Sequence, residues 1–464
     1  METLQAVRAV SEELHTLLTT MANQLAGESG FVQRVSKLTG AAFVQALVFG
    51  WLNNPQATLQ QLAQMAATVG VPISPQGLDQ RLTPDAATFL HRMVEQAVTQ
   101  VVAGEPVAIP LLERFQGVYL LDSTTIVLPD SLAEVWQGSG GGQGIHTAAA
   151  VKAQVQFDLV TGRLVGPFLQ SGRSHDRSAP QQTQFPVGAL RISDLGYFST
   201  PAFAELHQQG VYWLSRLHMF AHLFDLQGHP LPLAALPAWL TEHARDARDP
   251  SAPCDQVEVA LWLGGSGSSA PADASPGSGI PIRLVAVRVP PALAAARRDQ
   301  LMAEAKRKGQ PVSAPRLALA DWTIFLTNAP HHLLALEEVL VLARARWQIE
   351  LLFKLWKQHG LLDESRSGKP WRRLCELYAK MLGLLIQHWL FILSCWRYPA
   401  RSMTQATQVI RQYSTALALA LPFPDRIVDL LLHLRRCLAV GCRITKRKQA
   451  HATFQLLLAV APVT

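Results

Sequence analysis

Apolar residues at helical intervals dominate the first hundred residues of the chain. Between Ala57 and Leu82 such residues recur every three or four positions: Leu59, Leu62, Ala63 and Ala66. A turn at Gly70 follows, and Ser74 is placed to cap a second helix that begins at Pro75. Helix, turn and capped helix is the outline of a DNA-binding helix-turn-helix, although any helical hairpin shows the same pattern. We predict a helical domain over residues 1–105.

From Gly117 onward, β-branched residues and alternating polarity predict strands. Four segments show this pattern: GVYLLDSTTIVLP (117–129), AAVKAQVQFDLV (149–160), RLVGPFLQ (163–170) and ALRISDLGYF (189–198). Thr161-Gly162 predicts a hairpin turn between the second and third segments, and SHDRSAPQQTQF (174–185) predicts a loop and a short helix before the fourth. The ribonuclease-H-like fold begins with this order of elements, with its first and fourth strands side by side.

The second half of the chain predicts an insertion and then a return to the same core. Residues 223–320 contain strand-like segments, one basic helix and a Gly/Ser/Pro/Ala run over 264–279 that predicts a flexible loop. DWTIFLTNAP resumes a strand, and LEEVLVLARARWQIELLFKLWKQHG predicts a long helix. We therefore expect an α/β core flanked by helical ends, in five parts: 1–105 helical, 106–222 first core segment, 223–320 β-rich insertion, 321–400 second core segment and 401–464 helical.

Two aspartates stand where carboxylates are costly unless they are paired or bind a metal. Asp122 lies in the middle of an apolar strand, and Asp194 follows the apolar segment ALRIS. A turn or helix-capping role before Gly196 is the ordinary alternative for Asp194. Phosphodiester cleavage and rejoining use two metal ions held by a few carboxylates on rigid elements, so the pair indicates that chemistry.

A third acid, Glu350, lies within the long predicted helix. Arg346, Glu350, Lys354 and Lys357 fall at helical intervals, so we expect them on one face with Leu351 opposite. A solvated stripe of ion pairs is the ordinary interpretation of such a face. Here the rest of the helix is strongly apolar, and three cations around one acid suit a phosphate-binding site.

Charge, apolar runs and cysteines favour a polyanionic partner and argue against a membrane or secreted protein. Lys and Arg exceed Asp and Glu by seven, a surplus that suits a polyanionic partner but is also common in other proteins. The most apolar run, Met381–Trp396, is shorter than the roughly 20 residues that span a bilayer, so we expect a buried core helix and no membrane. No signal peptide is visible, and the five cysteines form no zinc-binding or CxxC pattern, which predicts reduced thiols in a cytoplasmic protein.

The segments LLDSTTI, ISDLGYF and RWQIELLFKLWK resemble the three acidic motifs of insertion-sequence transposases of the DDE superfamily. The resemblance covers roughly residues 30–400. It is to the branch of the insertion sequence 4 type, which carries a β-rich insertion and a Tyr-Arg-Glu-Lys signature. Arg346, Glu350 and Lys357 all stand at signature spacing.

This resemblance implies a ribonuclease-H-like catalytic core that cuts and joins DNA. Asp122, Asp194 and Glu350 would be the catalytic residues and would hold two Mg²⁺ ions, which Mn²⁺ could replace. Arg346 and Lys357 would bind DNA phosphates, and we add Lys354 and Arg344 as further phosphate contacts. The partners would be double-stranded DNA, as transposon inverted repeats bound by the N-terminal domain and as target, and a second copy of the chain in a homodimer. The protein would then work at the nucleoid of a prokaryote.

One departure from the signature leaves alternatives open. Its tyrosine would fall at Ala343, which has neither ring nor hydroxyl. Arg344 could substitute, or end-processing could be weakened. A transposase-derived DNA-binding protein without catalysis and a simple nuclease with this fold are the competing functions.

Other residues attract attention near these motifs. We expect Ser123 to hydrogen-bond around the site, and Trp322 to pack in the core rather than stack on an extruded base. His175 and Asp176 either lie near the site or begin an ordinary helix. The basic segment CRITKRKQ (442–449) either contacts DNA or is solvated surface.

Overall fold

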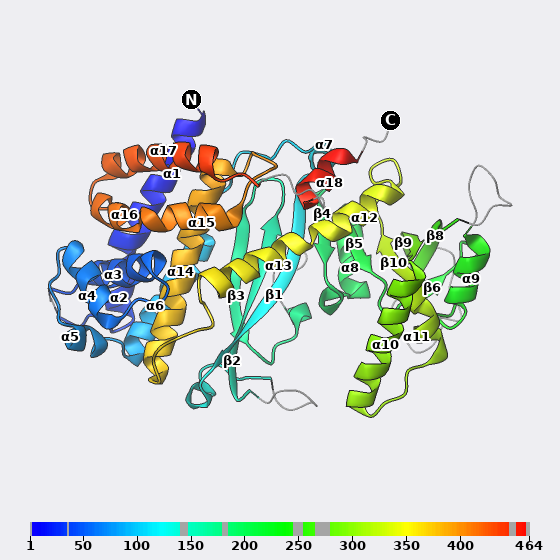
Figure 1. The fold of residues 1–464 in the computed structure, drawn as a ribbon, viewed down its shortest axis with the longest axis horizontal. Helices are drawn as coiled ribbons and strands as arrows, with labels where there is room; N and C mark the ends of the chain where they lie inside the picture. The colour runs from blue at the N-terminus through cyan, green and yellow to red at the C-terminus, as the bar shows by residue number, and fades with distance from the viewer. Residues whose placement is uncertain are drawn as a thin grey trace.

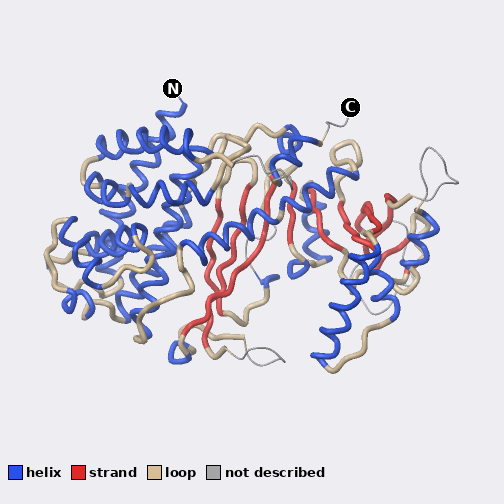
Figure 2. Tube along the Cα trace, viewed as in Figure 1, coloured by secondary structure: helices blue, strands red, loops and turns tan. Residues whose placement is uncertain are grey.

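The protein is built around one mixed sheet with a block of helices at one end. Its computed structural model describes residues 2–34, 37–139, 147–178, 184–244, 254–264, 279–444 and 452–460. Ten strands form the sheet in the order β3-β2-β1-β4-β5-β10-β9-β8-β6-β7. Most of the N-terminal and C-terminal helices pack together beyond β3, and the strands of the second half extend the opposite edge (Figure 1; Figure 2).

In the described part of the chain before the sheet lie seven α-helices: α1 (Glu2–Thr16), α2 (Ala22–Glu28), α3 (Gly40–Asn53), α4 (Leu59–Thr68), α5 (Pro75–Asp79), α6 (Pro84–Thr99) and α7 (Pro110–Glu113). A π-helical turn, Leu17–Met21, joins α1 to α2. The predicted cap is present, since the Ser74 hydroxyl accepts a hydrogen bond from the Gly77 N–H at 3.0 Å. However, α5 has only five residues, little more than one turn, which is short for a helix that reads a DNA groove. DNA binding by this domain stays a prediction.

The first half of the sheet follows the predicted order of strands. It comprises β1 (Val118–Leu128), β2 (Ala149–Asp158), β3 (Leu164–Ser171), β4 (Leu190–Ser193) and β5 (Tyr212–Arg216), with α8 (Thr200–Gln208) between the last two. As predicted, β1 pairs with β4, in parallel, and β2 turns into β3 through Gly162, whose φ of 75° favours glycine. Of the helix predicted within 174–185, the structure describes a 3₁₀ turn, Asp176–Ser178; residues 179–183 lie outside the described chain.

The strands of the predicted insertion extend the same sheet. They are β6 (His222–Phe224), β7 (Pro230–Leu231), β8 (Gln256–Gly264) and β9 (Ile280–Arg288), accompanied by α9 (Leu236–His243), α10 (Pro291–Lys308) and α11 (Ala314–Ala318). The returning strand β10 (Trp322–Thr327) pairs with β9 on one side and β5 on the other, and so joins the two halves. The predicted basic helix is α10, and most of the predicted flexible loop, 265–278, lies outside the described residues.

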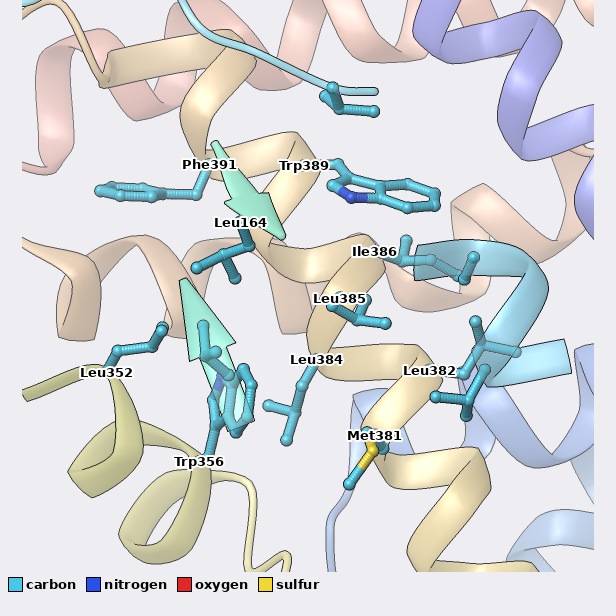
Figure 3. Packing of buried hydrophobic residues seen from close by; sticks show 14 of the residues in the cluster. Leu164, Leu352, Trp356, Met381, Leu382, Leu384, Leu385, Ile386, Trp389 and Phe391 are labelled. Atoms are coloured by element: carbon cyan, nitrogen blue, oxygen red, sulfur yellow. The ribbon is translucent and has the colours of Figure 1, made fainter. Parts of the chain in front are cut away.

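The long predicted helix is divided into α12 (Leu336–Ala345), α13 (Trp347–Lys354) and a π-helical turn (Leu355–His359). It crosses the sheet and leads to α14 (Pro370–Cys395), against which it packs (Figure 1). In Figure 3, Trp356 of the π-helical turn lies beside Leu384 of α14, within the main hydrophobic core. This anchoring fixes how α13 presents its polar residues to the sheet.

Helix α14 is the core helix that the sequence predicts. It is the only helix among the described residues long and apolar enough to cross a membrane, and its most apolar stretch is entirely buried inside the protein. After it come α15 (Met403–Gln412), α16 (Ser414–Ala420), α17 (Pro424–Gly441) and α18 (Thr453–Ala459). Since α17 contacts α1 and α16 contacts α3, the two ends of the chain share one helical block. The predicted basic segment lies mostly outside the described residues.

Candidate active site

Sheet register brings the two aspartates together. Strands β1 and β4 run parallel with Leu121 opposite Ser193, so Asp122 and Asp194 are the next residues on neighbouring strands. Asp122 is still within β1, whereas Asp194 lies just past β4 and begins a 3₁₀ turn, Leu195–Tyr197. Carboxylates 72 positions apart in the numbering thus become neighbours because β4 runs parallel to β1 and ends beside the middle of that strand.

The third acid, Glu350, lies on α13 and is linked to Asp122 by Arg346. Arg346 donates from Nη1 to Asp122 Oδ2 at 3.4 Å, and its Nη2 makes a hydrogen bond to Glu350 Oε1. One planar guanidinium therefore bridges a strand carboxylate and a helix carboxylate, as its fork of donors allows. All three side chains are between 18% and 29% exposed, so a ligand could reach them from solvent.

The pKa of Asp122 depends on burial and on the charges around it. Burial raises the pKa of Asp122 to about 6, against the lowering effects of the Ser123 backbone N–H and of Arg346. Asp194 and Glu350 raise it further, since each disfavours a second negative charge nearby. Asp122 thus interacts with both other acids, as three ligands of shared ions would.

A second polar cluster supports this arrangement from the side. The Ser123 hydroxyl donates to Asp176 Oδ1 at 2.8 Å, and Lys152 Nζ donates to the same oxygen at 3.0 Å. This confirms the expected hydrogen bonding by Ser123 and places Asp176 beside the site. Lys152 was missed, because a single lysine within a strand carries no local signal of its neighbour on the 3₁₀ turn.

The predicted phosphate-binding cations are divided between two sides of α13. Lys357 lies on the β1 side, where its Nζ donates to Thr125 O at 3.0 Å. Lys354 and Arg344 instead line a groove with Leu351, on a side whose lining does not include Glu350. The expectation that Lys354 shares the face of Arg346 is wrong. Lys354 follows Arg346 by eight residues, which turns its side chain about 80° away from Arg346 on a helix of 3.6 residues per turn. The packing of the helix against α14 determines which side of the helix each of them then occupies.

The ligand atoms of these three acids are of the type that a divalent cation prefers. Three carboxylates offer the hard oxygen ligands that Mg²⁺ and Mn²⁺ prefer. Within the described part of the chain, however, no three His, Cys, Asp or Glu side chains already stand close enough to hold an ion. Arg346 lies between two of the carboxylates and supplies a positive charge there. Closing the acids round an ion therefore requires this guanidinium to move.

Two further sequence expectations can be compared with the structure. Trp322 is 5% exposed and belongs to a second hydrophobic core, which agrees with core packing, although its edge lines a cavity of about 430 Å³. All five cysteines are free, as expected.

Comparison with known proteins decides the family. The Transposase DDE domain family matches residues 113–386, more than half of the chain. The chain belongs to this family. It is a transposase, an enzyme that cleaves DNA and transfers strands. The family implies a ribonuclease-H-like fold, with which the mixed sheet is consistent.

Three similar proteins come from different bacteria. The transposase for insertion sequence element IS231F of Bacillus thuringiensis subsp. israelensis is 26% identical over 384 residues, covering 81% of this chain and 78% of its own. The transposase for IS1151 of Clostridium perfringens is 23% identical over 378 residues, covering 78% and 76%. The putative transposase InsL for IS186A of Escherichia coli K12 is 30% identical over 210 residues, covering 42% and 50%.

Proposed function

We propose that this transposase cuts and joins DNA at the site formed by Asp122, Asp194 and Glu350, with two Mg²⁺ ions that Mn²⁺ can replace. The observation that carries the proposal is geometric: Asp122 lies next to Asp194 in the parallel register of β1 and β4, and Arg346 joins Asp122 to Glu350 of α13. When bound, such ions would activate the attacking oxygen and stabilise the leaving one. The residues' own task is to hold the scissile phosphate and the ions in line.

Each residue has a part that its position supports. Asp122 sits on the strand, where backbone pairing with β2 and β4 holds it rigidly, and Asp194 is held at the end of β4. Glu350 comes from α13, which packs on α14, and displacement of Arg346 would free its carboxylate for the ions. Arg346 and Lys357 flank this position and would bind phosphate oxygens of the cut strand.

The substrates that we propose are inverted-repeat ends and target DNA. Relatives that cover most of this chain are named as transposases for insertion sequence elements. Pairing two ends requires two active sites, so we propose a homodimer in the complex with DNA, with the helical domain over 1–105 binding the ends.

The test is cleavage of duplexes that carry the element's own ends, with Mg²⁺ or Mn²⁺ and with EDTA. Asp122→Ala, Asp194→Ala and Glu350→Ala should each lower cutting by about a thousandfold or more, while end binding in EDTA persists. Asp255→Ala serves as the matched control, because it removes an exposed acid just before the distant strand β8. Full cleavage by any of the first three would show that its role is misassigned.

Strand transfer separates the competing functions. Wild-type protein should join a pre-cut end to plasmid DNA. Cleavage without joining would identify a simple nuclease, and binding without cleavage would identify a transposase-derived DNA-binding protein.

A further inference from the structure

A second polar site lies on another side of the helix that carries Glu350. Residues of α12, α13 and the π-helical turn face the end of α14 and the starts of α15 and α18 across a groove of about 690 Å³. The start of this groove is where α15 contacts the π-helical turn that follows α13, and at its other end α18 lies next to α12 (Figure 1). The described lining contains no aspartate or glutamate.

Three cations give this groove a positive charge. Arg344 and Lys354 are exposed at its rim and make no ion pair within the described chain. Arg401, in its wall, is only 2% exposed. A cationic hollow without acids attracts an anion, because its field is not cancelled locally.

Among the described residues, Arg401 is a buried charge without an acidic partner. Its guanidinium lies between the rings of Trp396 and Phe454, at 3.5 Å and 4.3 Å from their centroids. Nη1 donates to the carbonyls of Trp396 and Tyr398, but Nη2 is buried without a hydrogen-bond partner among the described residues. Burial lowers the pKa of Arg401 to about 9, so it stays protonated at neutral pH. A buried charge of this kind is costly unless an anion comes close to it.

The N-terminus of α15 adds to this potential. Ser402 caps the helix, and Thr404 and Gln405 of its first turn line the groove. Unpaired backbone N–H groups at a helix N-terminus favour an anion. Helix end and buried arginine thus lie in one wall, opposite the cations of α12 and α13.

We propose that this groove binds a backbone phosphate of the DNA next to the strand being cut. The inference rests on the proposed function, in that DNA is the substrate. Glu350 precedes Leu351, which lines the groove, on a helix roughly 10–12 Å across with its side chains. A duplex carries a phosphate on each strand about every 3.4 Å of its axis. DNA held at the acids therefore passes phosphates within reach of Arg344 and Lys354.

The sharpest test is an isosteric change in the wall. Gln405→Glu completes a capping box with Ser402, so it favours the α15 helix while it brings a negative charge to the groove. Gln408→Glu makes the same change on an exposed position of the same helix outside the groove. In EDTA, anisotropy of a labelled duplex should show about fivefold weaker binding for Gln405→Glu and no loss for Gln408→Glu. Equal affinities of the two variants would overturn the proposal.

The salt dependence of DNA affinity measures how many phosphates the groove contacts. Arg344→Ala with Lys354→Ala should lower the slope of log affinity against log salt by about 2, since each phosphate contact contributes roughly 0.9 on duplex DNA. Lys306→Ala with Arg307→Ala removes the same charge from exposed positions of α10 and should leave the slope unchanged. A slope unchanged in both double variants would overturn the proposal.

Competition identifies the source of the phosphate. Millimolar inorganic phosphate should displace a short oligonucleotide from wild-type protein more readily than from Gln405→Glu. Tight binding of a mononucleotide, with no effect of Gln405→Glu on duplex DNA, would assign the groove to a small ligand instead. All arms are free of metal, so their failure leaves the cleavage test of the three acids untouched.

Discussion

The positively charged side chains on the two sides of helix α13 differ in whether they already have a partner within the protein. On the β1 side, Arg346 binds Asp122 and Glu350, and Lys357 donates to Thr125 O, so both cations already have protein partners. On the groove side, Arg344 and Lys354 are exposed and make no ion pair among the described residues. Cations bound to acids tune those acids, whereas free cations are available to an external anion. The difference predicts that one side governs the chemical step and the other governs binding.

Replacing one arginine on each side should separate these roles most strongly. Arg346→Ala removes the charge between two carboxylates and a donor to the phosphate, so we expect the maximal cleavage rate to fall about a hundredfold. Arg344→Ala should instead raise the DNA concentration needed for half-maximal cleavage several-fold. Single-turnover cleavage across a range of DNA concentrations measures both quantities.

Arg346→Lys sharpens that comparison. It keeps the charge but loses the bidentate fork, so it should recover only part of the rate. The division between the two sides would fail if Arg344→Ala lowered the maximal rate as much as Arg346→Ala does.

The sequence predicts those features of the site that depend on a short stretch of residues, and it does not predict those that depend on contacts between distant segments. Asp122 and Asp194 stand out because an acid in or after an apolar strand is unusual, and the order of strands predicts that β1 and β4 are neighbours. The pairing of β10 with β5 joins segments more than a hundred residues apart, which no local pattern encodes. Likewise, the side on which Lys354 lies depends on the packing of Trp356 against α14, not on spacing alone.

The acidity of Asp122 gives a pH-dependent test of the β1 side. Its pKa of about 6 lies above the ordinary value of 3.8, so the folded protein keeps this proton to higher pH than the unfolded chain does. Between those two values, stability of the metal-free protein therefore falls as pH rises. A divalent ion needs the carboxylate, so its affinity should fall about tenfold for each pH unit below 6.

Calorimetric titration with Mn²⁺ from pH 5 to 7.5 measures that dependence. Asp122→Asn lacks the titrating group and should bind weakly at every pH, and its melting temperature should not show the decline that we expect for the wild type between about pH 4 and 6. Arg344→Ala should follow the wild-type curve, since the groove side does not contact Asp122. Equal pH dependence in wild type and Asp122→Asn would assign the titration to another group.

We expect the smallest effect from substitution of Ala343, the position of the missing signature tyrosine. Ala343 lies on α12, half-buried against the main core, one turn before Arg346. Ala343→Tyr restores the signature ring and hydroxyl, and we expect end-processing to rise about two- to fivefold, because a phenolic hydroxyl can donate to a phosphate oxygen. Ala343→Phe adds the same ring without the hydroxyl and serves as the control. A gain with tyrosine alone would extend the catalytic side by one turn of helix. An equal gain with phenylalanine would mean that the ring acts by packing, and no gain with either would mean that Arg346 and Lys357 already hold the cut strand.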